Sequence, residues 1–256
     1  MTGTIASLYR HPIKGFTPER LEAVTLTAGA YFPCDRIYAV EDGPSGFDPE
    51  NPAFISKTKF TVLAKLPRVA LARTQYDEAS QCVTVTGPGM DALVADLSTA
   101  TGLAALADWL TVYLGDEVRG PLKVLPCAAE HRFTDSRSGY VSIINLASLR
   151  ALEAKLGAPI DPLRFRGNVY VEGWPAWDEM EWTGRVLTLG QARLEVIKPI
   201  VRCAATHVDP QTGERDIDLV PGLFNAYGHR YCGVYAKVTL GGAIAVGDWA
   251  KISPSA

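Results

Sequence analysis

The stretch ARLEVIK, residues 192–198, has apolar side chains at every second position (Ala192, Leu194 and Val196) with charged residues between them. Because successive side chains of a β-strand point to opposite faces, this alternation is typical of a strand with one buried face. Further short β-type runs lie at residues 21–27, 36–42, 68–74, 81–87, 168–173, 185–190, 232–240 and 243–252. Gly and Pro separate many of them at short spacings. The pattern predicts a mainly β protein of barrel or sandwich type rather than alternating β and α units.

Apolar residues at helical spacing mark two other segments. Residues 101–114 carry four leucines on one helical face, and Gly115 follows the last of them. Residues 145–156 begin with Asn145, a good N-cap, and Gly157 follows their last leucine. The sequence therefore predicts a few helices in a β-rich chain.

The length of 256 residues suits one large domain or two small ones. A polar, irregular segment at 127–139 is suited either to link two parts or to line a site. We place a boundary near residue 120. This predicts two closely packed β-rich domains, residues 1–120 and 121–256.

Composition narrows the classes of function. The formal net charge is −3 and no dense Lys/Arg cluster occurs, so nucleic acid is not expected as a partner. The chain has no apolar stretch of the roughly 18 residues that a membrane span needs, and its start does not resemble a signal peptide. Its five cysteines are widely spaced, unlike a disulfide framework. We expect a protein of the reducing cytoplasm, with no membrane partner.

Two basic residues in the first part could contact an anion. Lys14 precedes Gly15, and a glycine lets an anion approach the backbone closely. The alternative is a solvated lysine in a turn. Arg36 opens a β-type run, and its guanidinium could pair with phosphate or carboxylate through two hydrogen bonds. The alternative is a structural salt bridge with Asp35 or Glu41.

A third cluster lies in the stretch DPLRFRGNVYVEG, residues 161–173. Arg164, Arg166 and Asn168 are two positions apart, so in an extended segment all three point to the same side. Two cations and an amide on one face suit an anionic ligand that accepts hydrogen bonds. The alternative is pairing with acidic residues across strands.

Cys203 follows Arg202, and a neighbouring cation favours the thiolate that binds metals and attacks electrophiles. Small residues after it leave room for a bulky group at the sulfur. Free cysteines are also often buried apolar residues. A zinc site with His207, His229 and Cys232 is a weaker alternative, because no Cys-x-x-Cys pair is present. A nucleophilic role has only His207 as a candidate base.

The stretch that carries Arg164, Arg166 and Asn168 and the stretch that carries Cys203 together resemble the MOSC domain, the domain found at the C-terminus of molybdenum cofactor sulfurases. The matching stretches are RFRGNVYVEG (164–173), the segment 182–216, CGVYAKV (232–238) and GGAIAVGDWAKI (241–252). LYRHPIKG (8–15) and CDRIYAVED (34–42) resemble the β-barrel domain that precedes it. The combination of these two domains in one chain is similar to the mitochondrial amidoxime-reducing component and its bacterial relatives.

The resemblance implies a molybdenum–pterin cofactor between the two domains, with Cys203 as the only protein ligand of the metal. Implied cofactor contacts are Lys14, Gly15, Arg36, Ser138 or Gly139, Arg166, Asn168, Cys203 and Thr206. Asp209 is expected near the site, as a candidate catalytic proton donor. Three positions depart from the family pattern. They are Gly15 for serine, Gly167 for proline and Cys232 for phenylalanine.

The implied activity is two-electron reduction of N-oxygenated small molecules such as hydroxylamines or amidoximes. No pyridoxal phosphate is expected. The scattered cysteines offer no iron–sulfur ligand pattern, so the electrons require a separate protein of ferredoxin or cytochrome type. One alternative is a carrier of the cofactor or of sulfur without reductase activity. The other is a metal-free binding module in which Cys203 belongs to the core.

Overall fold

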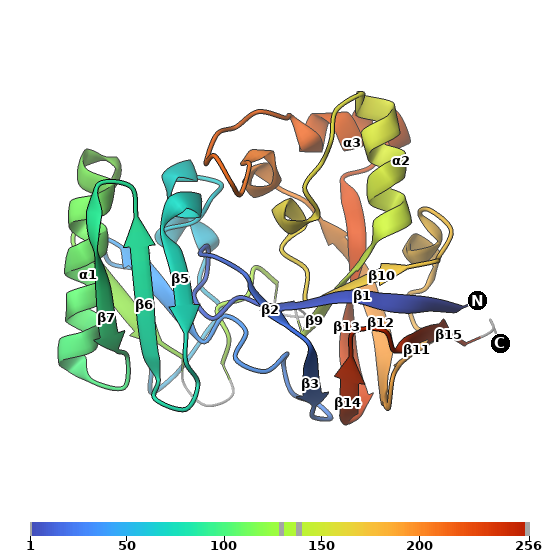
Figure 1. Ribbon diagram of the computed structural model, residues 1–256, viewed down its shortest axis with the longest axis horizontal. Coiled ribbons are helices and arrows are strands. Elements are labelled where there is room, and N and C mark those ends of the chain that lie inside the picture. Colours follow the sequence, from blue (N-terminus) through green and yellow to red (C-terminus); the bar gives the residue numbers. More distant parts are fainter. Residues whose placement is uncertain (1, 128–130, 137–139, 254–256) are drawn as a thin grey trace.

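The computed structural model describes residues 2–127, 131–136 and 140–253, and these ranges hold fifteen β-strands and three α-helices (Figure 1). The protein is mainly β, as the alternation of apolar residues predicts. None of the described helices is both long and apolar enough to cross a membrane.

A closed barrel of seven strands forms the larger part of the molecule. Its strands are β1 (Thr2–Arg10), β9 (Val141–Asn145), β10 (Val169–Glu172), β11 (Val186–Leu189), β12 (Ala192–Val201), β13 (Tyr231–Leu240) and β15 (Trp249–Ile252). They pair in the order β10-β9-β13-β12-β11-β15-β1, and β1 closes the ring by pairing with β10. β9 and β10 are parallel, and the other pairs are antiparallel. Ala192, Leu194 and Val196 all point into the barrel and are fully buried, which confirms the strand pattern of ARLEVIK.

The N-terminal strand belongs to this barrel, although all six other barrel strands come after residue 140. β1 bonds to β10 and β15, and β2 (Glu19–Leu21) pairs with the end of β1. β3 (Ala23–Leu26) pairs with β14 (Gly242–Ala245). The first and last parts of the chain are therefore joined through their strands, and the boundary near residue 120 stays a prediction.

A second, smaller unit carries α1 and the strands around it (Figure 1). β5 (Arg73–Tyr76), β6 (Cys82–Gly87) and β7 (Met90–Asp96) form an antiparallel meander, and β4 (Tyr38–Asp42) pairs with β8 (Leu122–Pro126). α1 (Ala100–Leu114) packs on this unit and ends at Gly115, as predicted.

Two helices lie side by side against the barrel, α2 (Leu146–Leu156) and α3 (Leu219–Tyr227) (Figure 1). The Asn145 side chain accepts a hydrogen bond from the Ala147 N–H, so the predicted cap of α2 is confirmed. α3 was not predicted from the sequence, because its stretch LVPGLFNAY contains both a proline and a glycine.

Two strand predictions were wrong in detail. Residues 68–74 were expected to be a strand, but a 3-10 helix spans Pro67–Leu71 and β5 begins only at Arg73. Pro67 at the start of that helix has a fixed φ angle and no N–H to donate to a sheet. Residues 243–252 form two strands instead of one, with a turn at Gly247 (φ 93°) between them.

Candidate functional site

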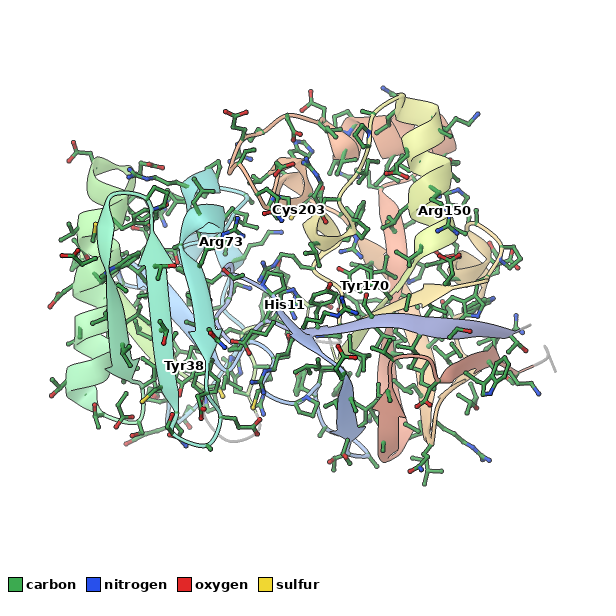
Figure 2. All side chains as sticks on the ribbon, viewed as in Figure 1. His11, Tyr38, Arg73, Arg150, Tyr170 and Cys203 are labelled. Carbon is green, nitrogen blue, oxygen red and sulfur yellow. The ribbon has the colours of Figure 1, made fainter. Side chains whose placement is uncertain are left out.

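A pocket of about 400 Å³ is lined by residues from both parts of the chain. Seven of the predicted site residues line it: Lys14, Gly15, Arg36, Arg166, Asn168, Cys203 and Thr206. Figure 2 shows Cys203 in the middle of the molecule, between the unit that carries α1 and the barrel with α2. Ser138 and Gly139 lie outside the described residues. The structure thus brings the candidates together, and their roles stay predictions.

Cys203 lies just after the end of β12 and caps the 3-10 helix Ala204–His207. The Thr206 hydroxyl donates to the Cys203 carbonyl at 2.9 Å and closes this turn. The thiol is half-buried and lines the pocket beside Lys57. Burial alone would lower the pKa of Lys57, but Asp135 and the Cys203 sulfur outweigh it and the pKa is raised. The sulfur therefore faces a basic recess.

Cys232 gives the opposite environment for the same side chain. It is fully buried among the apolar residues under α2 and α3, and burial raises its pKa to about 12. The zinc set considered from the sequence does not assemble. His207 and His229 use ring nitrogens to accept the N–H groups of Val220 and Tyr231. The part of the chain that the structure describes holds no cluster of three His, Cys, Asp or Glu suited to a metal.

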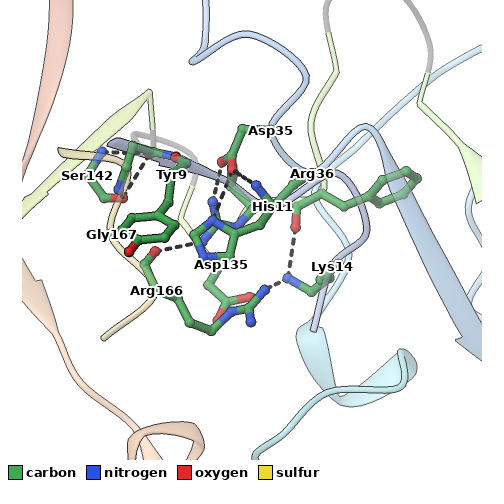
Figure 3. A network of polar contacts seen from close by, with 12 residues as sticks. Tyr9, His11, Lys14, Asp35, Arg36, Asp135, Ser142, Arg166 and Gly167 are labelled. Carbon is green, nitrogen blue, oxygen red and sulfur yellow. Dashed lines mark hydrogen bonds and ion pairs between the residues drawn. The ribbon is translucent and has the colours of Figure 1, made fainter. Parts of the chain in front are cut away.

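Arg36 and Arg166 both line the pocket, and Figure 3 shows their side chains in one network of polar contacts. Both have left-handed backbones, with φ 52° and 51°, a conformation that costs energy in residues other than glycine. Arg36 donates to the Arg166 carbonyl at 3.1 Å, and Arg166 Nη1 donates to the Phe16 carbonyl at 2.7 Å. Burial and the nearby Arg36 lower the pKa of Arg166 to about 10.

One donor of Arg166 has no partner. Its Nη2 is buried and forms no hydrogen bond with any residue that the structure describes. An unpaired buried donor on a cation is costly, and a bound anion would satisfy both its charge and its hydrogen bond. This atom is the clearest sign that the pocket is shaped for an anionic group.

His11 and Asp35 hold Arg36 in place (Figure 3). Asp35 pairs with the Arg36 guanidinium and also accepts the His11 backbone N–H at 2.8 Å. Its carboxylate lies 3.2 Å from His11 Nδ1. Burial and the nearby Arg166 lower the pKa of His11 to about 3, so the ring is neutral. The salt-bridge alternative for Arg36 is confirmed, and Arg36 nevertheless lines the pocket.

Lys14 is 4% exposed, and its ammonium donates to the Phe133 carbonyl at 2.8 Å and to Asp135. Gly15 follows with φ 90°, and a Cβ atom there would lie 2.6 Å from the Thr61 carbonyl oxygen. This backbone has no room for the serine that the family pattern has at this position. Gly15 is thus a change in backbone as well as the loss of a hydroxyl.

The segment around Arg166 is not extended, so the condition under which Arg164, Arg166 and Asn168 would share one side of a strand is not met. A 3-10 helix spans Pro162–Phe165, Arg166 is left-handed, and β10 begins after Asn168. All three residues still line the pocket. The Asn168 amide oxygen accepts from the N–H (3.0 Å) and the hydroxyl (2.8 Å) of Ser142, so it ties β9 to the pocket.

Gly167 takes the place of the family's proline. Its N–H donates to the Tyr170 hydroxyl at 3.0 Å, a bond that proline cannot make. A Cβ atom at this residue would lie 2.4 Å from Ile144. The glycine therefore fits tightly between the two neighbouring side chains.

Asp209 does not line the pocket. One of its carboxylate oxygens accepts from Arg164 at 2.8 Å, and the other accepts the N–H groups of Gln211 and Thr212. Arg164 in turn forms two bonds of 2.7 Å to Asp216. Asp209 thus fastens the loop after Cys203, a position that does not suit the proton donor expected from the sequence.

Other lining residues were not singled out from the sequence: Lys57, Thr134, Asp135, Ser136, Ser142, Lys198 and Tyr235. Of these, Asp135 contacts both Lys14 and Lys57. The polar character of 127–139 was a usable signal, because this segment supplies Thr134, Asp135 and Ser136. No comparable sequence feature around residue 57 marked Lys57 as a site residue.

Comparison with known proteins gives two family models along the chain. The MOSC N-terminal beta barrel domain matches residues 2–117, and the MOSC domain matches residues 130–250. Mitochondrial amidoxime reducing component 2 of Bos taurus is 24% identical over 96% of this chain and 82% of its own. A molybdenum cofactor sulfurase of Caenorhabditis elegans is 32% identical over 35% of this chain and 13% of its own. The crystal structure of the YuaD protein from Bacillus subtilis is 16% identical over 100% of this chain and 98% of its own, with a TM-score of 0.49. This chain belongs to the family of proteins that join a MOSC N-terminal beta barrel domain to a MOSC domain.

Proposed function

We propose that this protein holds a molybdenum–pterin cofactor and reduces N-oxygenated small molecules such as hydroxylamines or amidoximes. The observation that carries the proposal is that the half-buried thiol of Cys203 lines the same pocket as three cationic side chains, which we call the cradle: Lys14, Arg36 and Arg166. The similarity to an amidoxime reducing component along most of the chain supports the same activity.

The residues of the pocket fit the cofactor in two ways. Cys203 offers a soft sulfur donor of the kind that binds metals together with dithiolene sulfurs. The unpaired Nη2 of Arg166, with Lys14 and Arg36 beside it, suits the cofactor's phosphate. The volume of about 400 Å³ is in the range of small-molecule sites.

The reaction converts R–NHOH, two electrons and two protons into R–NH₂ and water. The molybdenum supplies the two-electron redox chemistry when it is bound. Cys203 binds the metal, and Lys14, Arg36 and Arg166 seat the phosphate. Asn168 and Ser142 hold the backbone of the cradle. Because Asp209 is tied to Arg164, we assign the supply of protons to water entering the pocket.

In this proposal, electrons reach the site from a separate electron-transfer protein of ferredoxin or cytochrome type. The five cysteines of the chain are all free thiols, so no disulfide among them can serve as the electron store. Cytoplasmic localisation is part of the same proposal.

The test is metal and pterin analysis of the protein made in a host that synthesises the cofactor. We expect about one molybdenum per chain, together with reduction of an amidoxime by the purified protein with a viologen reductant. Cys203→Ala should lose the metal and keep its circular dichroism spectrum. Cys82→Ala, at a partly exposed cysteine outside the pocket, should retain both metal and activity. Absence of molybdenum from the wild-type protein would contradict the proposal.

A second candidate is a carrier that binds the cofactor, or bears sulfur on Cys203, without reducing a substrate. The local similarity to a molybdenum cofactor sulfurase favours it. The same preparation separates the two functions. Bound molybdenum with no reduction of any N-hydroxylated compound would identify the carrier.

A further inference from the structure

Asp135 is the only acidic side chain among the described residues that line the pocket. The basic lining residues are Lys14, Arg36, Lys57, Arg164, Arg166, Lys198 and Arg202. Asp135 forms a bond to Lys14, and its other oxygen lies 3.6 Å from Lys57 Nζ. Figure 3 shows it among Lys14, Arg36 and Arg166. One carboxylate thus sits in the midst of most of the positive charge of the cradle.

Two of the other cations are held by different groups. Arg164 is neutralised by Asp209 and Asp216 outside the pocket. The Arg202 guanidinium donates to the carbonyls of Cys232 and Phe165, each at 2.8 Å. Asp135 is therefore the counterion for Lys14 and Lys57 in particular. Burial would raise the pKa of Asp135, but these two lysines outweigh it and hold the pKa well below its usual range.

Asp135 and its partner Lys14 differ in how firmly they are held. The Lys14 side chain is 5% exposed and is fixed by the Phe133 carbonyl, whereas the Asp135 side chain is 44% exposed. Turning the carboxylate toward solvent would expose little new apolar surface. Lys14 would remain in place, ready for another anion.

We propose that Asp135 is an internal counterion that occupies the cradle in the ligand-free protein and is displaced from Lys14 by a phosphate group. It would then determine which anions the site accepts. A phosphate monoester carries a charge of about −1.5 to −2 at pH 7, more than the carboxylate that it replaces. A monoanion gains nothing by the exchange and is excluded. The inference rests on the anion cradle of the proposed function.

The experiment is calorimetric titration of the cofactor-free protein with inorganic phosphate, and with acetate as the monoanion. Asp135→Asn keeps the shape and removes the charge. We expect it to bind phosphate about tenfold more tightly or better, because the neutral amide no longer competes with phosphate for the Lys14 ammonium. Acetate binding should become measurable. In a Lys14→Gln background the gain should be largely lost.

A matched control is Asp116→Asn, which removes one negative charge from an exposed residue at the end of α1. It should bind phosphate like the wild type. Asp135→Ser serves as the second variant if Asp135→Asn does not give a native circular dichroism spectrum. A larger rise of the melting temperature on adding phosphate, relative to wild type, is the independent readout.

Three results would overturn the inference. Equal or weaker phosphate binding by Asp135→Asn rejects Asp135 as a counterion. That result leaves the proposed function untouched as long as the wild type binds phosphate and Lys14→Gln does not, because the cradle is then still present. Equal gains with and without Lys14 would place the effect elsewhere. No phosphate binding by any variant would reject the cradle and the inference together.

Discussion

The interior of the barrel and the pocket beside it bury opposite kinds of side chain. Inside the barrel, Leu194, Val196 and Val234 are fully buried and belong to one apolar core. In the pocket, Lys14 is buried and Arg166 is half-buried with its Nη2 atom out of contact with solvent, although both side chains carry charge. Burial of the first kind stabilises the fold, and burial of the second kind costs free energy unless a counterion is present. The barrel therefore stabilises the fold, and the pocket holds positive charges that a bound anion would neutralise.

The largest expected effect is in the barrel. Leu194→Ala removes a fully buried side chain and leaves a cavity, so we expect the free energy of unfolding to fall by about 2–5 kcal/mol. Chemical denaturation measures it. Leu240→Ala, at a leucine that is 51% exposed on the neighbouring strand, is the control and should change stability by less than about 0.5 kcal/mol. Similar losses for both variants would contradict the division between the two regions.

The buried His11 behind the pocket makes stability depend on pH. Its pKa is lowered from 6.5 to about 3, so below pH 6.5 the unfolded chain binds a proton that the folded protein does not. Stability is therefore complete above pH 6.5 and falls as the pH is lowered, by at most about 1.4 kcal/mol per pH unit. The loss between pH 6.5 and pH 5 should be about 1.6 kcal/mol in denaturation experiments.

His11→Gln tests whether this residue is the cause. The variant has no imidazole, so its stability should change less over the same pH range, whatever its stability at pH 7. A pH dependence identical to that of the wild type would assign the effect to other groups.

Much of the barrel could be predicted because its information is local. The alternation in 192–198 gives both a strand and the face that it buries. The Asn145 cap and the Gly157 stop likewise mark α2 within a few residues. Closure of the barrel by β1 could not be read this way, because it depends on pairing with β10, some 160 residues later in the chain.

The pocket could be predicted only in part, and for a different reason. Cys203, Lys14 and Arg166 were identified through motifs of the family, while Lys57 and Asp135 were not. These two approach Cys203 and Lys14 only after the two parts of the chain are folded together. No periodicity marks such residues, since their positions depend on loops and on tertiary contacts.

Gly15→Ala adds backbone strain and a steric clash in the pocket. Residue 15 has φ 90°, and the new Cβ atom would lie 2.6 Å from the Thr61 carbonyl oxygen, so we expect a loss of about 1–3 kcal/mol in unfolding free energy. Gly29→Ala is the matched control, because its φ is 76° and nothing lies near the new atom. Gly29→Ala should lose less unfolding free energy than Gly15→Ala. An equal loss would show that backbone strain alone, without the clash, accounts for the effect.

The smallest expected effect separates affinity from stability most clearly. Arg166→Met removes the buried charge and its unpaired Nη2 at similar length, so phosphate binding to the cofactor-free protein should weaken by about tenfold. The free energy of unfolding without ligand should change little, because the lost bond to the Phe16 carbonyl is offset by relief of repulsion from Arg36. Calorimetry and denaturation of the same sample measure both quantities. A large loss of stability with unchanged phosphate affinity would mean that Arg166 serves the fold, as the barrel residues do, and that the cradle lies elsewhere.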